Sequence, residues 1–547
     1  MAQTWKLGVK AVRPGTYYRR SATGVETAGA TNGILACIFQ SNWGALNKEV
    51  DIDQTMMNNL EEYYGDGATI LREGLIGGAT TIRAIRVGGD DGTCAKVTLK
   101  TPMAIEEVEA TKTATVNTAD VTVNLDEGAI ADSIVVKTTV ATLTEGDDYT
   151  IIEGDNSVSV KVKGVTGGRG TVTIEYVKTV TIPNVNALEI SAKYPGEREF
   201  TVSVRTNLIT DKREILIYDG VNVFDAVNFE QGGDEAGEAA KAFATHRHFT
   251  ARALTAGVLD DVTQKAMTGG TNPTVEVANY DKGTETLERF KWNCVVADSD
   301  DSAVKGILND FVAQSYETGH LGMACVAGQS TQNLEARMQH AASCNDEKTV
   351  FLLNGWIAND GTVYDGWRGA ARIGGMIAAC ETNASLTHVV IKNALELIEP
   401  LTNGEIIRAE EKGCLVLSLN NEDQIWVDNA INTLVTIGND MDEGWKKIRR
   451  TKARFELMDR VNTTCDRYIG RLNNDDNGRA TLVSAMQGII NEMIAEHKLF
   501  EGSYAEEDPA HKPEGDRAYF LLHIGDIDSM EKIYLDYSFS YANPFAA

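Results

Sequence analysis

The sequence predicts a multidomain protein of mixed α/β and α+β class, because three stretches of the chain carry three different hydrophobic patterns. Between residues 289 and 356, near-continuous apolar runs alternate with amphipathic segments. Between 101 and 182, apolar and polar residues alternate one by one, and beyond residue 440 two long helical patterns follow each other. A chain of 547 residues has room for roughly three or four domains of typical size.

The pattern between residues 289 and 356 predicts a parallel β-sheet covered by helices on both faces, because strands buried on both faces of a parallel sheet are continuous apolar runs in the sequence. We assign residues 25–100 and 183–404 to this α/β domain. The clearest predicted strands are 289–298, 321–328 and 348–356. The predicted helices between them are 302–319 and 331–344.

A β-rich segment interrupts this domain. Its period-two runs are separated by Gly, Asp and Asn residues that favour turns, and Val158, Val160 and Val162 fall on one face of their run. We therefore predict that residues 101–182 form an inserted antiparallel β-sandwich domain.

The C-terminal part, residues 405–547, predicts an α+β domain. Helical stripes cover 442–470 and 473–502. The chain then closes in a predicted strand with large apolar side chains on one face, namely Ile533, Leu535, Tyr537, Phe539 and Tyr541.

The first 24 residues predict an extended arm. Pro14 and Gly15 disfavour a helix, while Tyr17 and Tyr18 are costly to leave in water. With Arg13, these residues suit β-augmentation, in which an extended segment adds a strand to a sheet of another chain.

Composition excludes several function classes. The net charge of −28 argues against wrapping nucleic acid, which requires a basic surface. No apolar run approaches the roughly 18 residues of a membrane span, and no signal-peptide pattern is visible. The eight cysteines form no CxxC pair, so we expect buried thiols in a reducing cytoplasm, with disulfides between subunits as the alternative.

The search for catalytic and metal-binding patterns predicts no enzyme, no cofactor and no metal. No phosphate-binding GxxxxGK[ST] string or HExxH pair is present. Ser330 lies between a predicted strand and a helix without the GxSxG pattern, and we interpret Ser330 or Thr331 as a helix N-cap. His246 and His248 can share one face of a strand, but no third ligand is evident.

The strongest charge feature is the basic cluster at 446–454, which has six basic residues in nine. On a helix, Lys446, Arg450 and Arg454 lie one turn apart and form a ridge. A solvated helix face is the ordinary interpretation. In a chain this acidic, however, the ridge is also a plausible dock for an acidic partner.

Several stretches together resemble the contractile tail sheath proteins of tailed phages and related injection machines. They run in the family's order over nearly the whole chain, apart from 101–182, and the last is the most specific. The matching stretches are 13–19, 71–89, 191–199, 267–273, 426–434 and 445–482.

The resemblance implies a non-enzymatic subunit of stacked hexameric rings around a tail tube. On a baseplate signal the sheath shortens and drives the tube through a cell envelope. The implied partners are other copies of the chain and the tail tube, baseplate and tail terminator proteins, without nucleic acid or membrane insertion. The implied place is the virion tail, assembled in the bacterial cytoplasm.

The resemblance also implies roles for parts of the chain. The middle domain is expected to be subtilisin-like, 101–182 to project outward, and 405–547 to face the tube. The arm and the terminal strand are expected to pair with neighbouring subunits. We take the tube-facing candidates to be Lys446, Lys447, Arg449, Arg450 and Arg454. A hydrolase built on the middle domain and an extracellular adhesin are the alternatives.

Overall fold

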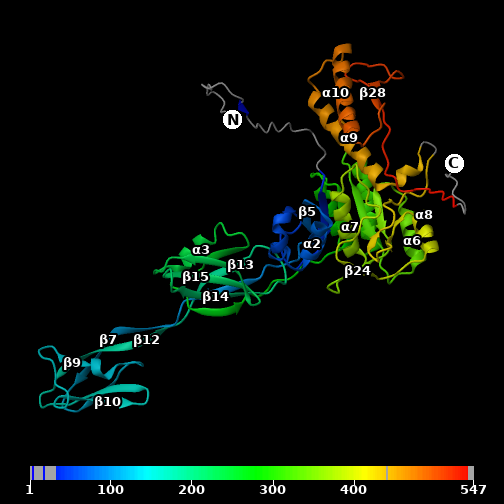
Figure 1. Ribbon diagram of the computed structural model, residues 1–547. Helices are drawn as coiled ribbons and strands as arrows, with labels where there is room; N and C mark the ends of the chain where they lie inside the picture. The colour runs from blue at the N-terminus through cyan, green and yellow to red at the C-terminus, as the bar shows by residue number, and fades with distance from the viewer. Residues whose placement is uncertain (1–2, 5–16, 19–31, 439–440, 540–547) are drawn as a thin grey trace. The chain divides into compact units, whose positions relative to one another are not determined.

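The computed structural model describes residues 3–4, 17–18, 32–438 and 441–539 (Figure 1). The chain divides into two compact units. The sheet unit comprises Met1–Gly92 and Asn272–Ala547, and the β unit comprises Thr93–Thr271.

A seven-stranded sheet forms the centre of the sheet unit, with the order β25-β21-β20-β19-β3-β5-β4. Every neighbouring pair is parallel except β4 and β5. The strands are β3 (Ile34–Phe39), β4 (Glu49–Asp53), β5 (Thr81–Arg86), β19 (Cys294–Ala297), β20 (Met323–Ala327), β21 (Thr349–Leu352) and β25 (Cys414–Leu415).

Helices cover both faces of this sheet, which explains why its central strands are apolar at every position. One face packs against α2 (Ala68–Gly77) and α7 (Trp367–Ala379). The opposite face packs against α4 (Val277–Leu287), α5 (Ser302–Glu317) and α6 (Leu334–Cys344).

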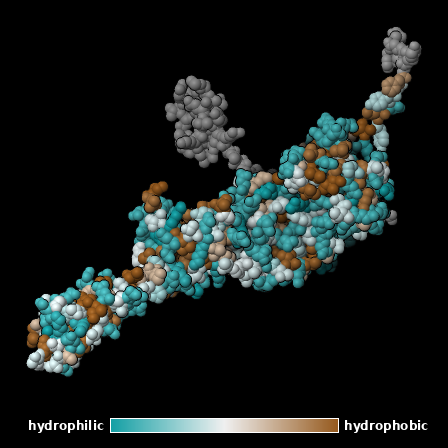
Figure 2. Space-filling model, turned by 90° about the horizontal axis from the view of Figure 1, so that it is seen from below, coloured by the Kyte–Doolittle hydropathy of each residue, from teal (hydrophilic) through white to brown (hydrophobic). Residues whose placement is uncertain are grey.

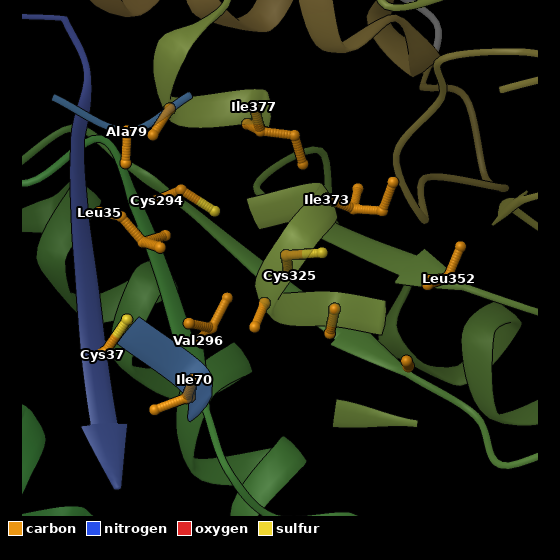
Figure 3. Packing of buried hydrophobic residues seen from close by; sticks show 14 of the residues in the cluster. Leu35, Cys37, Ile70, Ala79, Cys294, Val296, Cys325, Leu352, Ile373 and Ile377 are labelled. Atoms are coloured by element: carbon orange, nitrogen blue, oxygen red, sulfur yellow. The ribbon is translucent and has the colours of Figure 1, made fainter. Parts of the chain in front are cut away.

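Figure 3 shows the first of these two layers, a cluster that includes Leu35 and Cys294 of the sheet and Ile373 and Ile377 of α7, with Cys37 lying beside Ile70 of α2. The thiols are small buried apolar groups here, and burial raises the pKa of Cys294 to about 12. All eight cysteines of the chain are free thiols.

The remaining short elements of the sheet unit surround this core. They are η1 (Gln54–Asn59), α1 (Leu60–Tyr64), η2 (Gly65–Gly67), β22 (Trp356–Ala358), β23 (Val363–Tyr364), β24 (Ala394–Leu397), α8 (Asn403–Glu411), β26 (Leu417–Leu419), β27 (Ile425–Val427) and η4 (Glu443–Lys446).

The C-terminal module consists of two long helices and a hairpin with a separate small core. The helices α9 (Ile448–Tyr468) and α10 (Asp476–Ala495) pack against each other. Strands β28 (Tyr504–Glu507) and β29 (Phe520–His523) form the hairpin. Asp475 caps α10 by accepting a hydrogen bond from the Gly478 amide. Residues 473–478, with the sequence NNDDNG, therefore form a turn and a helix cap.

The β unit contains four sheets. Strands β7, β12 and β9 form one and β10, β11 and β8 another, and the two share one hydrophobic core. The other two sheets have the orders β17-β13-β6 and β16-β15-β14-β18. The elements, in addition to η3 (Ala131–Ser133) and α3 (Glu235–Ala242), are β6 (Lys96–Lys100), β7 (Ala104–Val116), β8 (Val121–Asn124), β9 (Val135–Thr138), β10 (Tyr149–Gly154), β11 (Ser157–Val162), β12 (Gly170–Ile182), β13 (Asn186–Ala192), β14 (Phe200–Asn207), β15 (Lys212–Asp219), β16 (Asn222–Phe229), β17 (Phe249–Ala253) and β18 (Val262–Ala266).

Two predicted boundaries differ from the units of the structure. Residues 183–271 were assigned to the α/β domain, but they fall in the β unit, because β13 pairs antiparallel with both β6 and β17. Residues 405–415 were assigned to the C-terminal domain, but β25 is the edge strand of the central sheet, where it pairs parallel with β21. In both cases strand pairing, which is a long-range choice, decides the domain.

Candidate functional site

The basic cluster lies at the start of α9, and its charges are largely paired within the chain. Lys446 lies 3.4 Å from Glu443. Lys447 forms an ion pair with Glu531, and its ammonium group donates to Asn429 Oδ1 over 2.8 Å. Neither lysine is therefore a free cation.

Arg450 and Arg454 share one carboxylate, that of Asp526. Arg450 Nε and Nη2 donate to the two oxygens of Asp526 over 2.8 and 2.6 Å, and Arg454 Nε donates over 3.2 Å. Burial alone would raise the pKa of Asp526, but the hydrogen bond from Arg450 and the charge of Arg454 lower it. Arg454 also donates to Glu347 over 3.1 Å, and its guanidinium lies 3.7 Å from the centre of the Trp445 ring.

Arg449 is the exception in this cluster. It is 7% exposed, and within the described ranges its Nε and Nη1 atoms have no hydrogen-bond partner. The sequence predicted a free cationic ridge, whereas the structure shows four of the five candidates paired with carboxylates of the same chain. The tube-facing assignment stays a prediction. The argument from a free cationic ridge does not support it, because the fifth candidate, Arg449, is buried.

The chain after the hairpin ends in exposed apolar side chains, visible in brown along this segment in Figure 2. We call residues 532–539 the apolar tail. Ile533, Leu535, Tyr537 and Phe539 are between 67% and 91% exposed. Residues 527–539 pair with no strand in the part of the chain that the structure describes, and Tyr541 lies outside it. Its described part, up to Phe539, therefore has no strand partner among the described residues of one copy.

The N-terminal arm is described at only four positions. The backbone of β2 (Tyr17–Tyr18) pairs parallel with β1 (Gln3–Thr4). Arg13, Pro14 and Gly15 lie outside the described residues, so β-augmentation by the arm stays a prediction.

The β28–β29 hairpin presents two different outer edges. On the β28 edge, Gln487 of α10 accepts a hydrogen bond from the Ala505 amide over 3.0 Å, so a helix side chain covers that edge. No other described strand pairs with β29. The backbone edge of β29 is therefore the open one.

An apolar groove of 530 Å³ lies against this module. Paired charges of Arg450, Arg454 and Asp526 line it together with apolar side chains. The apolar lining comes from Phe455, Leu457, Met458, Val461, Leu522 and Ile524.

Ser330, the serine that was considered for catalysis, is held in place by hydrogen bonds to a carboxylate. Ser330 Oγ donates to Asp365 over 2.5 Å, and the Ser330 amide donates to the same carboxylate over 3.0 Å. A carboxylate that accepts both bonds fixes the turn, whereas an activated serine requires a base such as histidine. The N-cap of α6 is Asn333, which accepts from the Glu335 amide, so the predicted N-cap at Ser330 or Thr331 was wrong.

The two histidines of the β unit converge on one carboxylate. His246 Nε2 lies 2.9 Å and His248 Nδ1 lies 3.7 Å from Asp225 Oδ2. Burial would raise the pKa of Asp225, but the hydrogen bond from His246 and the nearby His248 lower it well below its ordinary value. His246 Nδ1 accepts from the Phe249 amide over 3.2 Å. This nitrogen is therefore committed to the backbone rather than to a metal.

Two other kinds of site are absent from the described part of the chain. No three histidine, cysteine or carboxylate side chains there gather in a way that would hold a metal ion. No helix in those same ranges combines the length and the apolar character needed to span a bilayer.

Comparison with known proteins relates the middle of the chain to one family. Residues 274–433 match the family model of the phage tail sheath protein central domain. The chain therefore contains a segment similar to the central domain of phage tail sheath proteins. This segment includes α8 and β25, in agreement with their place beside the central sheet.

Solved structures show the same fold at low sequence identity. The sheath tail protein from Desulfitobacterium hafniense is 17% identical to this chain, with a TM-score of 0.62, and the match covers 95% of this chain and 99% of that one. A sheath tail protein from Listeria innocua is 16% identical with a TM-score of 0.59, and the match covers 91% and 96%. No curated protein matches the sequence. The mixed α+β multidomain class is confirmed.

Proposed function

We propose that this chain polymerises around a tail tube as a structural subunit, and that contraction of the assembly drives the tube through a cell envelope. The observation that carries the proposal is the apolar tail. Its large side chains are exposed in one copy of the chain, whereas exposed apolar patches in soluble proteins mark interaction sites.

The open edge of β29 is the acceptor that we propose for a strand from another copy. It offers unpaired backbone groups beside an apolar groove, so a strand there gains hydrogen bonds and buries side chains together. About six such hydrogen bonds at roughly 1 kcal/mol each give several kcal/mol for one joint. A donor tail and a different acceptor surface make a heterologous contact, which generates rings or open helices.

Hexameric rings stacked into a virion tail, assembled in the bacterial cytoplasm, are the form of assembly that we propose. The proposed partners beyond other copies are the tail tube, baseplate and tail terminator proteins. We keep Lys446, Lys447, Arg449, Arg450 and Arg454 as the residues proposed to face the tube, because the resemblance to sheath proteins implies this role for the C-terminal domain. The alternative, a hydrolase, is disfavoured because Ser330 is bonded to Asp365 rather than to a base such as histidine.

Negative-stain microscopy of the purified full chain tests the proposal. We expect hollow tubes from the wild type. We expect monomers with an unchanged thermal transition after deletion of residues 1–20, or after replacement of Ile533, Leu535, Tyr537 and Phe539 by serine. Leu208→Ser with Ile209→Ser is the matched control. These two apolar residues are 95% exposed, which is at least as much as the tail residues, but they lie far from the tail in sequence.

Two outcomes would contradict the proposal. If the wild type stays monomeric at high concentration, the proposal that the chain polymerises is wrong. Normal tubes from the tail variant would show that the apolar tail is not the joint.

A further inference from the structure

Two carboxylates in the last part of the described chain are held by the basic face of α9. We call residues 526–531, which lie between them, the strap. We propose that Lys447, Arg450 and Arg454 form a binding site for the strap, and that this site fixes the point from which the apolar tail leaves the body.

Asp526 provides the first attachment. Its side chain is 12% exposed, and it accepts three hydrogen bonds from two guanidinium groups. Arg450 is itself oriented by Asp442, which accepts from Nη1 over 2.9 Å. A planar guanidinium bound to both oxygens of a carboxylate defines the orientation of that carboxylate as well as its position.

Glu531 provides the second attachment. Its side chain is also 12% exposed and forms an ion pair with Lys447. The other oxygen, Oε1, accepts from Ser385 Oγ and Thr387 Oγ1 over 2.9 Å each. The site thus presents a cation and two hydroxyl donors to one carboxylate, and Ser529 Oγ adds a third donor at 2.8 Å.

Exposure changes abruptly after the second attachment. Glu531 is nearly buried, whereas Tyr534, three residues later, is 90% exposed. From Glu531 to Phe539 the extended chain can reach about 26 Å at roughly 3.3 Å per residue. The tail is therefore a short tether with a fixed root rather than the end of a loose segment.

The root is connected directly to the central sheet domain. Lys452 of α9, five residues after Lys447, is buried and donates to the carbonyl oxygens of Ile377 and Cys380 at the end of α7. A force applied to the tail would thus be transmitted through the strap to α9 and from α9 to α7. This role rests on the proposed function, whereas the binding site itself does not.

Trypsin provides a local test, because Lys532 directly follows the second attachment and cleavage requires the chain to leave its site. Release of the peptide 533–547 from the wild type would be timed by mass spectrometry. We expect Glu531→Gln, and separately Ser385→Ala with Thr387→Val, to accelerate release at least tenfold. Asp528→Asn is the matched control, because it also removes one negative charge, but among the described residues Asp528 bonds only to the neighbouring Ser529.

The outcomes separate the strap from the proposed function. Release from both strap variants within threefold of the wild type would overturn the binding site. If the strap variants release the peptide faster, the concentration needed for tubes should also rise at least threefold, while Asp528→Asn stays at the wild-type value. Unchanged tube formation by a loosened strap would overturn its role in assembly. If the wild type makes no tubes, the proposed function fails, and the trypsin result still decides the strap.

Discussion

Glu73 of α2 and Arg372 of α7 form an ion pair buried between the two helices. Arg372 Nε donates to Glu73 Oε2 over 2.9 Å, and the Tyr364 hydroxyl donates to Oε1 over 2.9 Å. Both charged residues are at most 4% exposed. The pair joins segments that are 299 residues apart and closes one face of the central sheet.

The first prediction concerns this ion pair. Arg372→Met should destabilise the sheet unit by about 3–5 kcal/mol, because it leaves the Glu73 carboxylate buried without its cation. Adding Glu73→Leu should restore most of the loss. Arg72→Met is the control, because Arg72 pairs with Glu61 at the surface, where such pairs contribute only about 0–1 kcal/mol. Urea denaturation measures all three, and equal losses for Arg372 and Arg72 would contradict the prediction.

The second prediction concerns the close approach of α2 and α7. A methyl group on Gly375 would overlap the backbone oxygen of Gly74, which cannot move without moving the helix. Gly375→Ala should therefore destabilise the protein by about 1–3 kcal/mol. Gly306→Ala, in the open interior of α5, should instead stabilise it by about 0.5–1 kcal/mol. Thermal unfolding checks the opposite signs, and a gain at Gly375 would disprove the packing argument.

The third prediction is a pH dependence at Glu410. Burial, together with the neighbouring Asp428, raises the pKa of Glu410 to about 7. Neutral Glu410 is thus favoured in the folded state. Its contribution is complete below the unfolded pKa of about 4.3 and is lost as the pH rises through 7.

Glu410→Gln should accordingly stabilise the protein at pH 8 and change little at pH 5. Glu411→Gln, at the exposed neighbouring position, is the control. The melting temperatures of Glu410→Gln, Glu411→Gln and the wild type, measured between pH 5 and 8, test this prediction. A difference between Glu410→Gln and wild type that stays constant over this range would refute the assignment.

The fourth prediction concerns the independence of the sheet unit. The β unit begins at Thr93 and ends at Thr271, whose backbones exchange hydrogen bonds of 3.2 and 3.1 Å. Joining Gly92 to Asn272 should therefore leave the sheet unit folded. We expect its thermal transition within about 3 °C of the original, which is roughly 1 kcal/mol for a large domain. A shortened chain without a cooperative transition would show that the β unit is required for folding.

Local patterns in the sequence were sufficient to predict the class of several regions, although not that of residues 183–271, which fall in the β unit. Continuous apolar runs such as Cys294–Ala297 indicated strands buried on both faces, and those strands lie in the central sheet. Alternation at 157–164 indicated a half-buried strand and corresponds to β11. These patterns depend on which side of an element faces a core, and this information is contained in neighbouring residues.

Tertiary structure alone decided which strands pair and which charges meet. The sequence indicated a helix with a ridge of cations at 446–454, and α9 begins within this stretch, at Ile448. The sequence could not show that Asp526, 76 residues after Arg450, folds onto that ridge, nor that Glu531 reaches Lys447. Charge and strand pairing act between residues brought together in space, so their partners depend on the path of the whole chain. For this reason a helix that its sequence presented as a dock for a partner became, in the fold, a binding site for the protein's own C-terminal segment.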